Sequence, residues 1–147
     1  MTFQSSLNRI TWKLHLLAAP EQVYDLLASN DGRAQFWAES AMELEKHVHF
    51  VFANGQIWRG KILDSQPGKL FQVEYSGGSK ATFRLSGDGK AGTVLEFDNE
   101  GVPEAGRAEA TAAWVSMLMA LKAAVDFGID LRNHDDNFTW DKGFVDN

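Results

Sequence analysis

Residues 105–131 read AGRAEATAAWVSMLMALKAAVDFGIDL, and they are the longest helical stretch that the sequence predicts. The stretch contains no proline and is rich in alanine, leucine and methionine. At about 3.6 residues per turn, Trp114, Leu118 and Leu121 fall in one narrow stripe that Val125 extends. A helix of this length would span roughly 40 Å. We therefore expect the other elements to pack around this helix.

The residues before this helix form short runs in which apolar and polar side chains alternate, a pattern typical of half-buried strands. Turn residues such as Ala53-Asn54-Gly55 separate the runs at intervals of about 8–12 residues, which favours antiparallel pairing. One short helix is expected from Ala18 until Asn30-Asp31-Gly32 breaks it, and a shorter one carries Phe36 and Trp37. The expected strands occupy residues 10–16, 42–45, 47–52, 57–65, 69–75, 80–86 and 93–99.

The order of these elements predicts an α+β fold of the helix-grip kind, in which a curved antiparallel sheet wraps around the long C-terminal helix. With 147 residues, 44% of them hydrophobic and 23% charged, the chain fits one domain that covers residues 1–147. The net charge of −6 argues against a nucleic-acid surface. The absence of cysteine excludes disulfides, zinc–thiolate sites and thiol nucleophiles.

The localisation of the protein is predicted from segments that the sequence lacks. Residues 1–8 have no basic start followed by an apolar run, so they do not form a signal peptide. No apolar stretch is expected to approach about 18 residues, the length that a membrane-spanning helix needs. We therefore expect a cytoplasmic protein without a membrane span.

Short motifs along nearly the whole chain resemble one known family when taken in order. They are Ala19-Pro20-Glu21, Val23-Tyr24, Leu27, Asp31-Gly32, Phe36-Trp37, Gly60-Lys61-Ile62, Pro67, Leu70, Val73, Gly92-Thr93, Glu100-Gly101, Trp114, Leu118, Leu121-Lys122, Val125 and Gly128. On these residues the chain resembles the START-like or SRPBCC superfamily, in the branch similar to the C-terminal domain of the Hsp90 ATPase activator. The resemblance implies the START-like (Bet v 1-like) helix-grip fold, with an apolar cavity between sheet and helix. It implies less about activity, because the superfamily holds lipid and small-molecule binders, a few enzymes and co-chaperone modules.

The candidate site is a set of apolar side chains on the expected inward faces. Its members are Phe36, Trp37, Phe50, Phe52, Trp58, Phe71, Phe83, Phe97, Trp114, Leu118, Leu121 and Val125. These residues form either a close-packed core or the lining of a pocket that also contains a few polar groups, such as Arg59 or Tyr75. The sequence alone does not separate the two interpretations.

Two further patterns have structural explanations that we prefer to functional ones. Residues 87–92 spell GxGxxG, but a strand follows them where a dinucleotide-binding loop needs a helix, so they are expected to form a hairpin turn. His47 and His49 share one face of a strand, yet no third metal ligand is placed near them, and Val48 and Phe50 occupy the inward positions. We expect no metal and no cofactor.

No catalytic group is identified. Glu96, Asp98 and Glu100 alternate along the last strand and could act as acid–base carboxylates, but they lie opposite Leu95 and Phe97 and are expected to face solvent. No serine stands in a nucleophile elbow. An enzyme of the cyclase or hydrolase kind, as rarer superfamily members are, would need an ionisable group buried in the cavity.

Apolar residues also occur where the long helix should face solvent, at Val115, Met119 and Phe127. The acidic tail, residues 132–147, adds Phe138, Trp140, Phe144 and Val145. The tail could fold back over the helix, or the outer face could pack against a second copy in a homodimer.

These observations lead to one main hypothesis and an alternative. We expect a binding module that holds a small apolar ligand between sheet and helix. The alternative is a protein-interaction or co-chaperone module similar to the Hsp90 activator's domain, which would bind a chaperone through its surface.

Overall fold

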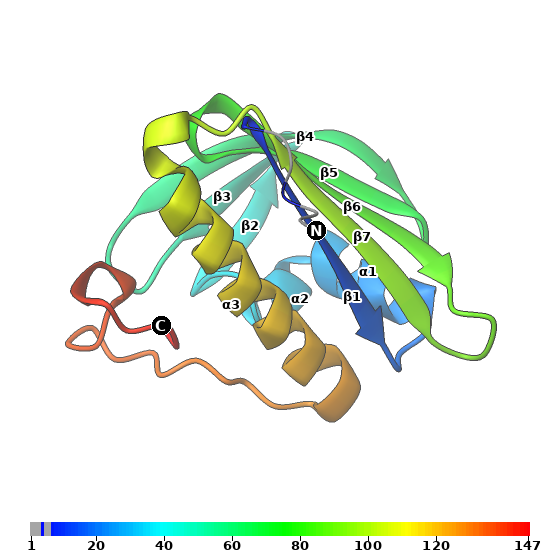
Figure 1. The fold of residues 1–147 in the computed structure, drawn as a ribbon. Helices are drawn as coiled ribbons and strands as arrows, with labels where there is room; N and C mark the ends of the chain where they lie inside the picture. The colour runs from blue at the N-terminus through cyan, green and yellow to red at the C-terminus, as the bar shows by residue number, and fades with distance from the viewer. Residues whose placement is uncertain (1–3, 5–6) are drawn as a thin grey trace.

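Seven antiparallel strands form one sheet in the order β1-β7-β6-β5-β4-β3-β2, which curves around one side of a long helix (Figure 1). The strands are β1 (Arg9–Leu16), β2 (Ser40–Leu44), β3 (His47–Val51), β4 (Ile57–Gln66), β5 (Leu70–Tyr75), β6 (Ser79–Gly87) and β7 (Thr93–Glu100). The structure is a computed structural model that describes residue 4 and residues 7–147. The predicted α+β helix-grip fold is confirmed, because the sheet is antiparallel and the long helix is C-terminal to it.

Two short helices follow β1, as predicted, but their boundary differs from the expected one. The helices are α1 (Pro20–Ala28), α2 (Asn30–Ala34) and α3 (Arg107–Phe127), with 3-10 turns η1 (Ser76–Gly78), η2 (Glu104–Gly106) and η3 (Trp140–Lys142). Residues 30–32 were expected only to break the first helix, but they also form the start of α2. The Ser29 hydroxyl accepts a hydrogen bond from the Gly32 amide at 3.0 Å and caps this second helix. Phe36 and Trp37 therefore lie just after α2 and not within it.

The long helix α3 is shorter than the predicted residues 105–131. It ends at Phe127 because Gly128 adopts the left-handed conformation, with φ of 64°. The amides of Gly128 and Ile129 then bond back to Ala124 and Ala123, which closes the last turn. Ile129 and Leu131 consequently belong to the tail and not to the apolar stripe of the helix.

One face of α3 packs on the concave side of the sheet, where Trp114, Leu118 and Leu121 are buried. By length and composition alone, the segment Glu104–Phe127 would also suffice to cross a membrane. The premise that no stretch approaches this length was therefore wrong, because the alanines and methionines between the larger residues add to the apolar length. Core helices have the same composition, and here 39% of the most apolar part of the segment is buried.

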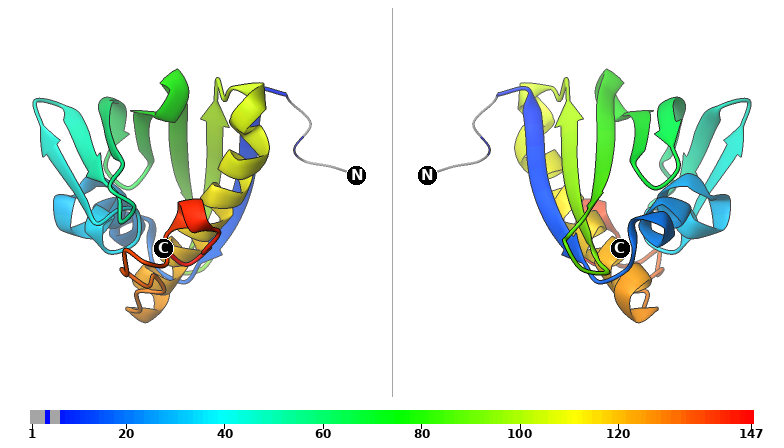
Figure 2. Two further views of the ribbon diagram at one scale, coloured as in Figure 1. Left: turned by 90° about the vertical axis from the view of Figure 1, so that its left-hand side faces the viewer. Right: turned by 90° about the vertical axis from the view of Figure 1, so that its right-hand side faces the viewer.

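The sheet and α3 diverge from each other toward the β2–β4 end of the sheet. α3 contacts β1, the strand at the opposite edge, while β2 to β4 curve away from the helix (Figure 2). The chain after α3 runs back across this open side and ends between α3 and the far strands (Figures 1 and 2). The fold thus leaves a space bounded by sheet, helix and tail.

Candidate ligand cavity

A cavity of about 690 Å³ lies between the concave face of the sheet, α3 and the tail. Its inner wall contains the rings of Trp37, Trp58, Tyr75 and Trp114. Its edge includes exposed residues such as Gln56, so the cavity is open to solvent. The volume falls within the range of about 300–1,000 Å³ that is usual for small-molecule sites.

The turn between β3 and β4 brings two aromatic side chains to one wall of the cavity. Phe52 and Gln56 close the hairpin, with 2.9 Å between the Phe52 amide nitrogen and the Gln56 carbonyl oxygen. Gly55 has φ of 86°, a conformation that a residue with a Cβ rarely adopts. The hairpin places the Phe52 and Trp58 rings 4.7 Å apart, and both line the cavity. The predicted asparagine-glycine turn therefore builds part of the site.

The aromatic rings continue from this wall to the helix without interruption. Tyr75 lies at the centre, with its ring centroid 4.8 Å from that of Trp58 and 4.8 Å from that of Trp114. Trp37, which follows α2, lies 5.8 Å from Tyr75 and 6.2 Å from Trp114. Rings contributed by the sheet, the α2–β2 connection and α3 thus form one continuous apolar surface, on which an aromatic or alicyclic ligand can pack.

Of the predicted site residues, only some line this cavity. Those that do are Phe36, Trp37, Phe52, Trp58 and Trp114. Those that pack in the core and do not line it are Phe50, Phe71, Phe83, Phe97, Leu118, Leu121 and Val125. Strand alternation places Phe50 and Phe83 on the concave face as expected, but the Trp37 ring lies over both, at 5.0 and 5.3 Å between centroids. The Trp114 ring covers Phe97 in the same way, at 4.4 Å.

Among the polar groups of the aromatic inner wall, Tyr75 has an unused donor. The indole nitrogen of Trp37 donates to the Tyr75 hydroxyl at 3.1 Å, and that of Trp114 donates to the Asn99 side-chain oxygen at 2.9 Å. Among the described residues, no acceptor lies within hydrogen-bonding distance of the Tyr75 hydroxyl, so its own proton is free for a ligand or water. Burial raises the pKa of Tyr75, which keeps the hydroxyl protonated.

The sequence identified one polar cavity residue correctly and missed others. Tyr75 lines the cavity, whereas Arg59 is exposed on the convex face because Trp58, its neighbour on β4, points inward. Asn99 was missed, although it is the uncharged position between Asp98 and Glu100 and shares the inward face of β7 with Phe97. A polar residue in the inward series of Leu95 and Phe97 was the signal that could have located it.

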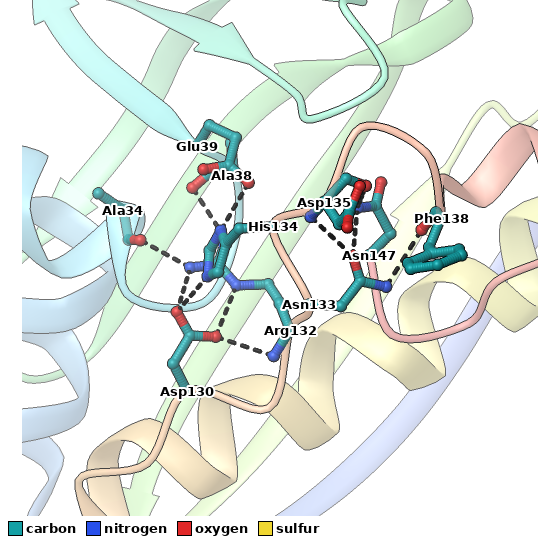
Figure 3. A network of polar contacts seen from close by, with 10 residues as sticks. All are labelled: Ala34, Ala38, Glu39, Asp130, Arg132, Asn133, His134, Asp135, Phe138 and Asn147. Carbon is teal, nitrogen blue, oxygen red and sulfur yellow. Dashed lines mark hydrogen bonds and ion pairs between the residues drawn. The ribbon is translucent and has the colours of Figure 1, made fainter.

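The tail supplies a wall that the sequence did not predict in detail. Leu131, Arg132, Trp140 and Val145 line the cavity from this side. The guanidinium of Arg132 donates to the carbonyl oxygens of Ala34 at 2.7 Å and Ala38 at 2.9 Å (Figure 3). The tail therefore packs on the same chain and is held to the connection between α2 and β2.

The other motifs lie away from the cavity. Glu96 and Glu100 pair with lysine and arginine side chains on the convex face of the sheet, and Asp98 shares that face. Residues 87–92 connect β6 to β7 as a hairpin, so no helix follows the glycine run. Within residue 4 and residues 7–147, no group of three His, Asp or Glu side chains is placed to hold a metal ion.

Comparison with known proteins places the chain by family and by fold. The sequence model of the family described as Activator of Hsp90 ATPase homolog 1-like protein matches residues 17–126. Among curated proteins, none matches the chain. Among solved structures, the Aha1 dimer from Colwellia psychrerythraea superposes with a TM-score of 0.73 and 23% identity, covering 82% of this chain and 97% of that chain.

Two further solved structures have the same fold. CalU16 from Micromonospora echinospora gives a TM-score of 0.65 at 21% identity, covering 78% of this chain and 72% of its own. DynU16, a protein of the dynemicin biosynthetic locus, gives 0.74 at 17% identity, covering 86% of this chain and 50% of its own. At such identities these likenesses establish the fold alone.

Proposed function

Because the chain belongs to the family of Activator of Hsp90 ATPase homolog 1-like proteins, we propose that it holds a small, largely apolar ligand between its sheet and α3. The observation that carries the proposal is the 690 Å³ cavity, whose inner wall consists of aromatic rings with one unused hydroxyl donor. Apolar walls with few polar groups are the usual composition of small-molecule sites. The donor at Tyr75 fits a ligand that carries a carbonyl or ether oxygen.

Binding without catalysis is the better-supported reading of this cavity. Tyr75 is the titratable group at its inner wall, and a phenol with a raised pKa donates a hydrogen bond but does not act as a base at neutral pH. The carboxylates that line the cavity, Glu109, Asp141 and Asp146, lie on exposed parts of α3 and the tail. Hydrogen bonding lowers the pKa of Asp141, so this carboxylate is ionised at neutral pH and has no proton to give as a general acid.

A titration with the fluorescent ketone prodan tests the proposal, because its emission changes when it leaves water for an apolar site. We expect saturable binding, weakened at least about tenfold by Trp58→Ala, which removes one aromatic wall. Trp12→Ala is the matched control, because Trp12 packs against the core and does not line the cavity. Absence of saturable binding, or equal losses in both variants, would contradict the proposal.

A second candidate function, binding of a protein partner, is favoured by a patch on the convex face of the sheet. This convex patch consists of Met42, Leu44, Val51, Ile57, Arg59 and Lys61, on the outward positions of β2, β3 and β4. Elsewhere on this face Arg9 and Lys80 pair with Glu100, at 3.1 and 3.7 Å, and Lys13 pairs with Glu96. Within the described part of the chain, no carboxylate forms an ion pair with the cations of the convex patch. Exposed apolar area beside unpaired cations suits a partner with an acidic docking surface.

The edge of the sheet does not offer a simpler docking mode. The outer side of β2 is occupied by α2, because the Arg33 side chain donates to the Ala41 carbonyl at 3.0 Å and the Glu43 amide donates to Asn30 at 2.8 Å. A partner could therefore not extend the sheet here by strand addition. It would have to contact the convex patch through side chains.

The family name makes an Hsp90-type chaperone the partner to test, with stimulation of its ATPase as the readout. Neighbouring residues of β4 provide matched variants, because Ile57 and Arg59 lie on the convex patch while Trp58 lines the cavity. We expect Ile57→Glu and Arg59→Glu to abolish stimulation and Trp58→Ala to retain it. The reverse pattern, or no stimulation by the unaltered chain, would exclude this second function.

A further inference from the structure

The tail forms a wall of the cavity but lies outside the part of the chain that matches the family. That match ends at residue 126, and α3 ends at Phe127. Leu131, Trp140 and Val145 nevertheless line the cavity from the side opposite the sheet. The cavity of this chain is therefore completed by a segment that lies beyond the residues matching the family.

The tail is fastened to the domain by a charged cluster, Asp130, Arg132 and His134, which we call the latch (Figure 3). Arg132 bonds to the carbonyls of Ala34 and Ala38, and its remaining N–H groups donate to both carboxylate oxygens of Asp130 at 3.0 Å. One ring nitrogen of His134 lies 2.7 Å from Asp130, and the other lies 2.6 Å from Glu39. Both nitrogens face carboxylates, so the closed latch is complete when His134 is protonated.

Beyond the latch the tail is folded on itself, so it can move as one body. Asn133 donates through its amide to the Asp146 carbonyl at 2.7 Å and through its side chain to the Asp146 carboxylate at 3.0 Å. The rings of Phe138 and Phe144 lie 5.1 Å apart within the same loop. The tail is also attached to α3, because the Trp140 indole nitrogen donates to the Glu109 carboxylate at 3.0 Å. This is one hydrogen bond, and it is exposed to solvent. Gly128, in the left-handed conformation, ends α3 and begins the tail.

We propose that residues 128–147 are a lid over the ligand cavity, and that the latch formed by Asp130, Arg132 and His134 with Ala34, Ala38 and Glu39 holds the lid closed. The proposal rests on the ligand-binding function inferred above. It adds that entry to and exit from the cavity require release of the latch, and that Trp140 and Val145 contact the bound ligand. The core of the domain contains no tail residue, so the lid can open while the fold stays intact.

Protonation of His134 sets the direction in which pH acts on the lid. Glu39 and Asp130 accept from its ring and raise its pKa above the ordinary value of 6.5, and the charged groups that face it are these two and Arg132. The stabilisation is therefore fully present below pH 6.5 and is lost as pH rises through the raised pKa. The lid is expected to open more readily in alkaline than in mildly acidic solution.

A thiol-labelling experiment tests the lid without any ligand. The natural chain has no cysteine, so Ala113→Cys places a single thiol on the cavity wall of α3. We expect His134→Ala and Arg132→Lys to speed its reaction with N-ethylmaleimide at least about tenfold, because each removes bonds that hold the lid shut. Lysine keeps the charge of Arg132 but cannot reach two carbonyls and a carboxylate together. Glu45→Gln, an exposed charge change outside the latch, is the control.

The effect of pH is tested by measuring the labelling rate of the Ala113→Cys thiol with and without His134→Ala at each pH. Taking the ratio of the two rates cancels the effect of thiol ionisation. The ratio of variant to unaltered rate should fall between about pH 6 and about pH 9. Rates that agree within about twofold across all variants would overturn the lid, whatever the ligand result. Faster labelling without prodan binding by any variant would support the lid and contradict the proposed ligand function. The two failures are thus distinguishable.

Discussion

The Tyr75 hydroxyl accepts a hydrogen bond from the indole N–H of Trp37, and its own O–H can donate to a bound molecule. Tyr75→Phe removes that donor without removing the ring that packs on Trp58 and Trp114. We expect the affinity for prodan, which carries a carbonyl, to fall about 3- to 10-fold, the size of one hydrogen bond. The affinity for N-phenylnaphthylamine, which has no oxygen, should not change. Equal losses for the two probes in fluorescence titrations would show that the ring, and not the hydroxyl, was disturbed.

Leu121 and Met117 lie on neighbouring turns of α3 but have different surroundings. Leu121 is fully buried in the core, whereas Met117 is partly buried and lines the cavity. Leu121→Ala should lower the free energy of unfolding by about 2–5 kcal/mol, because it leaves a void in close-packed surroundings. Met117→Ala should cost less than about 2 kcal/mol, since its side chain already borders empty space. Urea denaturation measures both, and a small loss at Leu121 would mean that the cavity extends beneath the helix.

The position of α3 on the sheet depends on one carboxylate near its C-terminal end. Both oxygens of Asp126 accept from the Leu17 amide at 3.0 Å, one accepts from the Ala18 amide at 3.1 Å, and Lys122 pairs with it at 3.1 Å. Burial alone would raise the pKa of Asp126, but these hydrogen bonds outweigh it and lower the pKa below 3.8. The carboxylate thus joins the helix to the connection between β1 and α1.

We expect Asp126→Asn to lower the free energy of unfolding by about 1–3 kcal/mol at neutral pH. Because the folded pKa is depressed, the contribution of the carboxylate is present above pH 3.8 and is lost as pH falls through the lower folded value. The difference between variant and unaltered chain should therefore shrink toward about pH 2. Thermal unfolding across pH measures it, with Asp25→Asn, an exposed change of the same kind outside this contact, as the control. A pH-independent difference would indicate packing and not charge.

The tail contacts the domain through the latch, through Trp140 and through a hydrogen bond between Asp141 and Asn54, but none of its residues belongs to the core. Removal of residues 133–147 should therefore leave the fold intact by circular dichroism. The melting temperature should drop by only a few degrees, about the effect of 1 kcal/mol in a domain of this size. Probe dissociation should become faster at the same time. Unchanged melting and unchanged dissociation together would mean that the tail is not held against the domain in solution.

The molecule as a whole retains an apolar surface beside the tail. Val115 and Met119, one turn apart on α3, are 41% and 48% exposed even with the tail in place, and Phe127 is 60% exposed. Such a surface commonly marks association. We expect self-association that rises with concentration in sedimentation experiments, and Met119→Glu should return the chain to a monomer. Met42→Glu, on the convex face, is the control. A monomer at every concentration would exclude a homodimer through this face.

Local patterns in the sequence were enough to predict the strands, their antiparallel pairing and the long C-terminal helix. Period-two alternation and turn residues act over a few positions, so Ile10 to Leu16 or Ala53 to Gly55 specify their own conformation. Helix ends were predicted less well. Residues 30–32 begin a second helix, because the Ser29 hydroxyl accepts a hydrogen bond from the Gly32 amide and caps it. The end of α3 depends on one left-handed residue, Gly128.

The division between core and cavity was decided only by tertiary structure. All inward aromatic residues share one sequence signature, and alternation does not tell whether a neighbouring element covers them. Trp37 and Trp114 come from outside the sheet and lie over Phe50, Phe83 and Phe97, so they separate these rings from the cavity. The tail wall arises in the same way, because Arg132 reaches carbonyls more than ninety positions earlier in the chain. The sequence thus determined which faces are apolar, while packing between distant segments determined which apolar residues remain open to a ligand.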